Sequence, residues 1–123
     1  MFEIYVEENF SAAHHLKGYS GDCARPHGHN WLVEVYVVTR ELDGIGIGID
    51  FRDVKDAVSS VISQFDHTDL NEHPAFKVEN PTSENIAKYI YQEISRRLNN
   101  DKAAVSKVKV CETLGAGAFY WEE

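Results

Sequence analysis

Long apolar runs are missing from this sequence. Nowhere does it approach the roughly 18 consecutive apolar residues that a membrane-spanning helix needs. Its first residues, Met1 to Glu8, carry acidic side chains where a signal peptide would carry basic ones. We therefore expect a cytoplasmic protein with no membrane partner.

Cysteines and basic residues are also scarce. Only Cys23 and Cys111 are present, too few for a disulfide framework, so thiol chemistry or plain packing is the expected use of each.

The 12 lysines and arginines are outnumbered by 20 aspartates and glutamates, which leaves a net charge of -8. Such a chain lacks the positive field that draws proteins onto nucleic acid, so we expect no nucleic-acid partner. An anionic substrate would have to meet a local basic pocket, helix amino ends or a neighbouring subunit.

The start of the chain shows a regular alternation of apolar and more polar residues. Phe2, Ile4 and Val6 recur with the period of a strand that has one buried face, and the pattern continues toward His14. The segment Asn30–Thr39 is rich in aromatic and β-branched residues. It is predicted to be the antiparallel partner of the first strand.

Two helices are predicted in the middle of the chain. Asp50 can cap the first, whose apolar residues between Val54 and Phe65 recur every three or four positions. The second is predicted to begin near Thr82. Its apolar stripe consists of residues spaced by four, namely Ile86, Ile90, Ile94 and Leu98.

The last part of the chain is predicted to return to strands. Val108, Val110 and Glu112 share one strand face, and residues 115–117 turn the chain into residues 118–121. The order ββααββ describes an α+β fold in which two helices cover one face of an antiparallel sheet. With 43% apolar residues, 123 residues suffice for one core, so we expect a single domain over residues 1–123.

Three histidines have the spacing of a metal site. His27 and His29 project from the same face if HGH is already strand, and Gly28 leaves room between them. His14, at the end of the first strand, can supply a third ligand if the two strands pair there. Three neutral imidazoles with one open position are typical of catalytic zinc. The alternative for so short a pattern is a set of surface or hydrogen-bonded histidines.

Four further residues are candidates for chemistry. Cys23 lies in a loop near Arg25, and cationic surroundings favour the thiolate, so it is a candidate base; packing is the alternative. Asp66 and His67 are adjacent, and a carboxylate can orient an imidazole for proton transfer or simply cap a helix end. Glu112 continues a buried strand face, where a carboxylate needs donors. Those donors are either the paired N–H groups of a ligand or an internal partner such as arginine.

Six short motifs occur in an order and spacing that resemble the 6-pyruvoyltetrahydropterin synthase and 6-carboxytetrahydropterin synthase family. The resemblance covers nearly the whole chain, and six motifs in one order are not expected by chance. The motifs are FSAAH (residues 10–14), CARPHGH (23–29), DF (50–51), DHTDLN (66–71), NPTSEN (80–85) and ET (112–113).

The resemblance implies the tunnelling fold (T-fold), in which ββααββ units join through their sheets into a trimeric barrel. Two trimers would stack into a homohexamer with active sites between subunits. The implied cofactor is Zn²⁺, held by three ligands: His14, His27 and His29. Catalysis is assigned to three residues: Cys23 as general base, with Asp66 and His67 as its proton-handling partners. Glu112 would bind the substrate by anchoring its pterin ring.

The substrate implied by the resemblance is 7,8-dihydroneopterin triphosphate. Cys23 is present and no glutamate occupies residues 24–26, which argues against the variants that replace dihydroneopterin aldolase. The short chain resembles the bacterial type and favours a 6-carboxytetrahydropterin synthase of the queuosine (7-deazaguanine) pathway, a lyase that releases acetaldehyde and triphosphate. The alternative is a 6-pyruvoyltetrahydropterin synthase. A non-catalytic zinc- or pterin-binding subunit is a second alternative, against which the presence of Cys23, Asp66 and His67 speaks.

Overall fold

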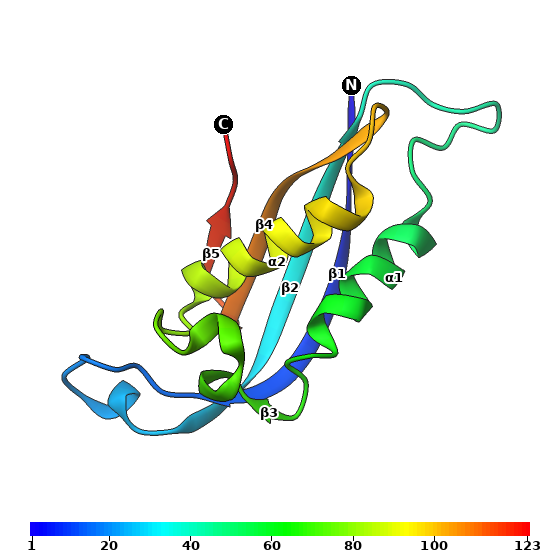
Figure 1. The fold of residues 1–123 in the computed structure, drawn as a ribbon. Helices are drawn as coiled ribbons and strands as arrows, with labels where there is room; N and C mark the ends of the chain where they lie inside the picture. Colours follow the sequence, from blue (N-terminus) through cyan, green and yellow to red (C-terminus); the bar gives the residue numbers. More distant parts are fainter.

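The computed structural model describes all 123 residues and contains one five-stranded sheet with two helices (Figure 1). The strands follow the order β3-β1-β2-β4-β5 across the sheet. The elements are β1 Phe2–His14, β2 His27–Thr39, α1 Phe51–Ile62, β3 Thr68–Asp69, α2 Ser83–Leu98, β4 Ala103–Thr113 and β5 Ala116–Tyr120. The predicted α+β class and the order ββααββ are confirmed, and the two-residue β3 is an addition to them.

β1 and β2 pair antiparallel along their whole length. The register runs from Phe2 opposite Thr39 to His14 opposite His27. β2 begins earlier than the predicted start at Asn30. Histidine and glycine carry little strand preference of their own, so the HGH segment is strand because it pairs with the end of β1.

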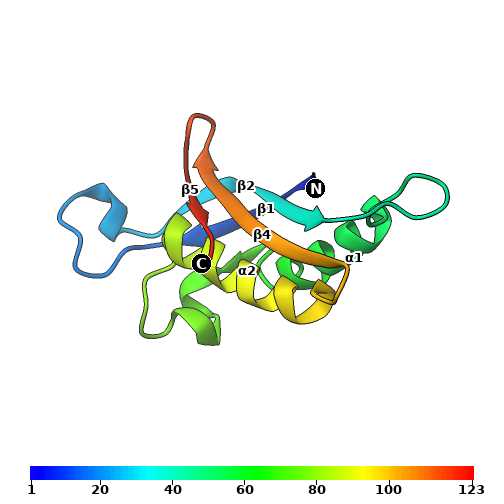
Figure 2. The same ribbon diagram turned by 90° about the horizontal axis from the view of Figure 1, so that it is seen from above.

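α1 and α2 begin at the predicted caps. The Asp50 side chain accepts the backbone N–H of Arg52 over 2.8 Å, and the Thr82 hydroxyl accepts that of Asn85 over 3.1 Å. These bonds satisfy amide groups that the first helical turn leaves free. Both helices lie on the same face of the sheet (Figure 2). No helix of the structure is long and apolar enough to cross a membrane. Between helices and sheet lies the core, whose largest fully buried side chains include Trp31, Phe65, Phe76, Leu70, Ile86, Ile90 and Ile94.

The segment between α1 and α2 covers the edge of β1. It contains β3 and two 3₁₀ helices, η2 (Leu70–Glu72) and η3 (Pro74–Phe76). β3 pairs parallel with β1, with Thr68 opposite Ala12 and Asp69 opposite Ala13. Two residues are too few to show a strand period, which is why the sequence pattern did not predict β3.

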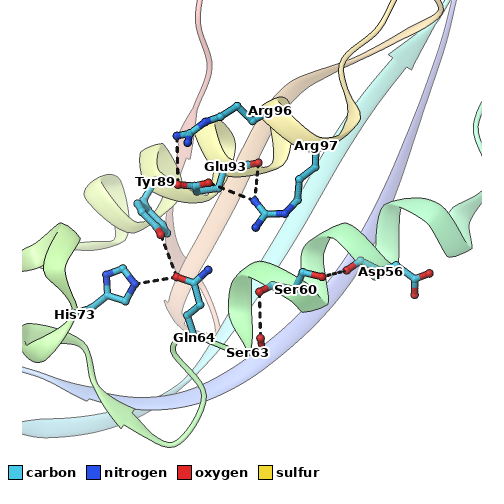
Figure 3. A network of polar contacts seen from close by, with 9 residues as sticks. All are labelled: Asp56, Ser60, Ser63, Gln64, His73, Tyr89, Glu93, Arg96 and Arg97. Atoms are coloured by element: carbon cyan, nitrogen blue, oxygen red, sulfur yellow. Dashed lines mark hydrogen bonds and ion pairs between the residues drawn. The ribbon is translucent and has the colours of Figure 1, made fainter.

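A polar network ties the end of α1 to α2 (Figure 3). His73 Nε2 lies 2.9 Å from Gln64 Oε1, and the Tyr89 hydroxyl donates to the same oxygen over 3.0 Å. His73 Nδ1 accepts the backbone N–H of Ala75 over 3.1 Å, so the ring is neutral with its proton on Nε2. Burial lowers the pKa of His73, in keeping with this neutral form.

The other face of the sheet carries no helix (Figure 2). Aromatic side chains lie exposed on it: Tyr5 stacks on Tyr36 with ring centroids 5.4 Å apart, and Phe119 follows on β5. The Lys107 ammonium lies 4.7 Å from the centroid of the Tyr36 ring. Grouped aromatic side chains on an uncovered face are typical of a surface that another chain covers.

Candidate metal centre and active site

The three histidines nominated as metal ligands converge at the end of the β1–β2 pair. His14 lies directly opposite His27 in the register, and His29 lies opposite Ala12. Ring centroids are 4.6 Å apart for His14 and His27, 4.8 Å for His27 and His29, and 5.3 Å for His14 and His29. The strand pairing therefore brings together three imidazoles from two parts of the chain.

Backbone carbonyls orient two of these rings. His14 Nδ1 lies 2.8 Å from the carbonyl oxygen of Pro81, and His27 Nδ1 lies 2.7 Å from that of Arg25. A carbonyl oxygen only accepts, so each ring carries its proton on Nδ1 and leaves Nε2 as a lone pair. The indole of Trp31 packs edge-on against His14, at a centroid distance of 4.8 Å. The rings are thus held in the tautomer that binds a metal.

Glu112 brings a carboxylate into the same cluster. Its Oε1 lies 3.0 Å from Nε2 of His14 and 3.0 Å from Nε2 of His29. Both nitrogens are nevertheless buried without a hydrogen-bond partner. The sequence pattern predicted that Glu112 lies on the buried face of its strand, with Val108 and Val110, but did not predict its contact with the histidines.

The donor set fits a metal ion. The ligand atoms of His14, His27, His29 and Glu112 all lie within 4.8 Å of one another. Burial lowers the pKa of His29, and the neighbouring His14 and His27 add to this against the opposing effect of Glu112, so the ring is neutral as a metal ligand must be. Buried nitrogens without a partner are costly, and a metal ion would satisfy them.

Asp66 and His67 contact each other but lie outside this cluster. Asp66 Oδ1 accepts the backbone N–H of Ser11 over 2.9 Å and lies 3.1 Å from His67 Nδ1. The bond from Ser11 lowers the pKa of Asp66 most, and the contact with His67 adds to it. His67 is the one non-glycine residue with positive φ, at 60°, and its side chain is 81% exposed. Backbone strain of this kind is often found at functional sites.

A cavity of about 400 Å³ lies beside this pair. Its lining includes His67 and His29, together with Ser11, Ala13, Gly28 and Asn30. The last four alternate with the clustered histidines along β1 and β2, so the cavity opens mainly on the face of the sheet that carries no helix. The Asp66–His67 pair and the histidine cluster therefore lie largely on opposite faces of the sheet.

Cys23 lies in the loop that joins β1 to β2. It forms part of the short 3₁₀ helix η1 (Asp22–Ala24), is half-buried and has a free thiol. Its backbone carbonyl accepts the N–H of Leu16 over 2.9 Å. Cys111, by contrast, is buried in β4.

Comparison with known proteins identifies the family. A family model described as 6-pyruvoyl tetrahydropterin synthase matches residues 3–123. The chain belongs to this family. A protein of Archaeoglobus fulgidus provisionally named 6-carboxy-5,6,7,8-tetrahydropterin synthase is 39% identical over 109 residues, which cover 89% of this chain and 86% of that protein. The 6-carboxy-5,6,7,8-tetrahydropterin synthase of Bacillus subtilis is 35% identical over 119 residues, which cover 91% and 80%.

The fold agrees with that of solved members of the 6-pyruvoyl tetrahydropterin synthase family. The 6-pyruvoyl tetrahydropterin synthase of Caenorhabditis elegans aligns with a TM-score of 0.86 at 28% identity, and the alignment covers 99% of this chain and 96% of that one. The tunnelling fold that the six motifs implied is confirmed for the single chain.

In this member of the 6-pyruvoyl tetrahydropterin synthase family, two residues that hold the cluster were not predicted. The Pro81 carbonyl orients His14, and Trp31 packs on it. Proline and tryptophan side chains are not metal ligands, so their residue types alone did not indicate a role at this site. The available signals were the NPTSEN motif and the position of Trp31, two residues after His29 on the same strand face.

Proposed function

We propose that this chain is a zinc-dependent 6-carboxytetrahydropterin synthase of the queuosine pathway. It would convert 7,8-dihydroneopterin triphosphate to 6-carboxy-5,6,7,8-tetrahydropterin and release acetaldehyde and triphosphate. The observation that carries the proposal is the cluster of three imidazoles beside the carboxylate of Glu112. The names of the Archaeoglobus and Bacillus relatives favour this product, since both match most of the chain. The proposed setting is the cytoplasm, where Cys23 stays a reduced thiol.

In this reaction each of the side chains at the site would have a separate role, in metal binding, proton transfer or substrate binding. A zinc ion bound by the three histidines would act as a Lewis acid toward the hydroxyls of the substrate side chain. Cys23 removes a proton from that side chain as the general base. Asp66 orients the ring of His67, and this pair carries protons to and from the same side chain. Glu112 accepts the paired N–H groups of the pterin ring, for which its carboxylate turns away from the histidines that it now contacts.

We further propose that neighbouring copies complete the active site, in a homohexamer made of two trimers. The uncovered sheet face carries exposed aromatic side chains, and β5 is an edge strand that a neighbouring sheet can join. The Asp66–His67 pair is exposed and stands outside the metal-ligating group. A pair in this position is available to the metal centre of a neighbouring chain.

Product analysis tests the proposed activity. The zinc-loaded protein is incubated with 7,8-dihydroneopterin triphosphate, and the products are identified by mass spectrometry. We expect 6-carboxytetrahydropterin together with acetaldehyde. Formation of 6-pyruvoyltetrahydropterin without acetaldehyde would assign the chain to the alternative activity, which the name of the Caenorhabditis structure represents. Binding of the substrate without conversion would indicate a non-catalytic subunit.

A further inference from the structure

We propose that the side chains of Asn71 and Asn80 are positioning residues that hold the Cys23 loop at the metal centre. The proposal rests on the proposed role of Cys23 as the base. The segment concerned is residues 15–17, which joins the ligand His14 to that loop. Figure 1 shows the loop extending past the end of the sheet, on the side where the segment between α1 and α2 lies.

Asn71 binds the backbone of His15 through both ends of its amide. The N–H of His15 donates to Asn71 Oδ1 over 2.9 Å, and Asn71 Nδ2 donates to the carbonyl of His15 over 3.1 Å. Two such bonds to one residue reproduce a rung of an antiparallel sheet. Asn71 is only 5% exposed, and its own N–H donates to the Asp69 side chain. These bonds fix the orientation of its amide.

Asn80 binds the backbone of Lys17 in the same way. The N–H of Lys17 donates to Asn80 Oδ1, and Asn80 Nδ2 donates to the carbonyl of Lys17, both over 2.9 Å. The Asn80 carbonyl in turn accepts the side-chain amide of Asn85, in the first turn of α2, over 2.9 Å. The next residue, Pro81, presents its carbonyl to His14. One short segment therefore orients a metal ligand and holds the chain that leads away from it.

Leu16, between the two held residues, bonds on the opposite side. Its N–H donates to the carbonyl of Cys23 over 2.9 Å. Residues 15–17 thus alternate their hydrogen bonds as a strand does, with the asparagines on one side and Cys23 on the other. A shift of this segment moves the backbone of Cys23 relative to His14. Because a misplacement of about 1 Å can cost a hundredfold in rate, the two asparagines control catalysis through the position of Cys23.

Aspartate variants test this role. Aspartate has nearly the shape of asparagine and still accepts the N–H, but it places a second oxygen against the peptide carbonyl and so breaks half of the pairing. Asn71→Asp and Asn80→Asp are made in a Cys111→Ala background, which leaves Cys23 as the only thiol. Asn100→Asp is the matched control, because Asn100 is exposed before β4 and uses only its side-chain oxygen, as acceptor of the N–H groups of Lys102 and Ala103. The measurements are zinc content, the rate of Cys23 alkylation by iodoacetamide, kcat and KM.

We expect both variants to keep their zinc and a KM close to that of the parent, while kcat falls by about tenfold to a hundredfold. The alkylation rate of Cys23 should change in both, and Asn100→Asp should match the parent in every measurement. A general loss of folding would lower zinc content and every rate together, whereas a positioning role separates kcat and thiol reactivity from zinc content and KM.

Unchanged alkylation and unchanged kcat in both variants would overturn the proposal, and so would a loss of zinc that accounts for the fall in kcat. If the buried charge prevents Asn71→Asp from folding, the half-buried Asn80→Asp decides the outcome alone. If the parent protein has no turnover, the proposed function fails, but the alkylation rates still report whether the asparagines position Cys23.

Discussion

The Nδ1 atom of His14 lies 2.8 Å from the carbonyl oxygen of Pro81, 67 residues further along the chain. This contact decides which nitrogen of His14 carries the proton, because a carbonyl cannot donate. The Arg25 carbonyl does the same for His27. Backbone carbonyls therefore set the form of His14 and His27 in which Nε2 is free to bind a metal.

Removal of any one of the three histidines should empty the metal site. His14→Ala, His27→Ala and His29→Ala each delete one of three imidazoles, and we expect about one zinc per chain in the wild type and little in each variant. Metal analysis of the purified proteins measures this. His15→Ala is the control, since the His15 side chain is outside the cluster. Full zinc occupancy in all three variants would contradict the assignment.

Glu112→Gln should weaken pterin binding and leave zinc in place. The change removes the charge and replaces one acceptor oxygen by an NH2 group, which can only donate, so we expect a loss of about 1.5–3 kcal/mol, or roughly tenfold to a hundredfold in affinity. Titration calorimetry with neopterin measures the affinity, and metal analysis the zinc. If zinc is lost instead, the 3.0 Å contacts with His14 and His29 mark Glu112 as a metal ligand.

Cys23→Ala should abolish most of the turnover without affecting zinc or stability. Loss of a general base costs about a hundredfold or more in kcat. Cys23→Ser should fare little better, because a hydroxyl is far less acidic than a thiol. Steady-state assays with Cys111→Ala as the control measure the effect. A normal rate in Cys23→Ala would transfer the role of base to Asp66 and His67.

Mixed oligomers should recover activity that each parent variant lacks. Cys23→Ala and His67→Ala each remove one half of the proposed machinery. If a site takes Cys23 from one chain and His67 from its neighbour, random mixing leaves about a quarter of the sites intact. The activity of co-refolded chains measures this. Mixtures as inactive as the separate variants would show that each site is built within one chain.

Stability should fall as the pH drops below about 6.5, partly because of His73. Its pKa is lowered in the folded chain, so the unfolded chain takes up the proton first. The stabilisation is fully present above the unfolded value of about 6.5 and is lost below it, as protonation of Nδ1 breaks the bond from Ala75. Urea unfolding of metal-free protein between pH 8 and pH 5 measures the slope. His73→Asn keeps a capping side chain and removes the titration, so its slope should be smaller; an equal slope would exclude His73.

Much of the fold follows from short-range patterns in the sequence. Three kinds of pattern involve residues only a few positions apart: the alternation from Phe2 onward, the caps Asp50 and Thr82, and the helical stripes. The strand and the two helices that they predict are all present. The HGH spacing is of the same kind, because the pleat of a strand fixes which residues share a face. The alternation, the caps and the helical stripes therefore need no knowledge of the folded chain, whereas HGH becomes strand only through its pairing with β1.

The sequence by itself therefore determined the two helices, the long strands and their order, whereas the tertiary structure decided the position of β3, the convergence of the three histidines and what surrounds them. The carboxylate of Glu112 meets His14 and His29 because β4 pairs with β2 in a register that places Cys111 opposite Leu32, which no periodicity reveals. The contact from Pro81 and the paired bonds from Asn71 and Asn80 join residues more than fifty positions apart. Such contacts depend on where the chain returns in space, which is settled by packing of the whole core rather than by any local preference.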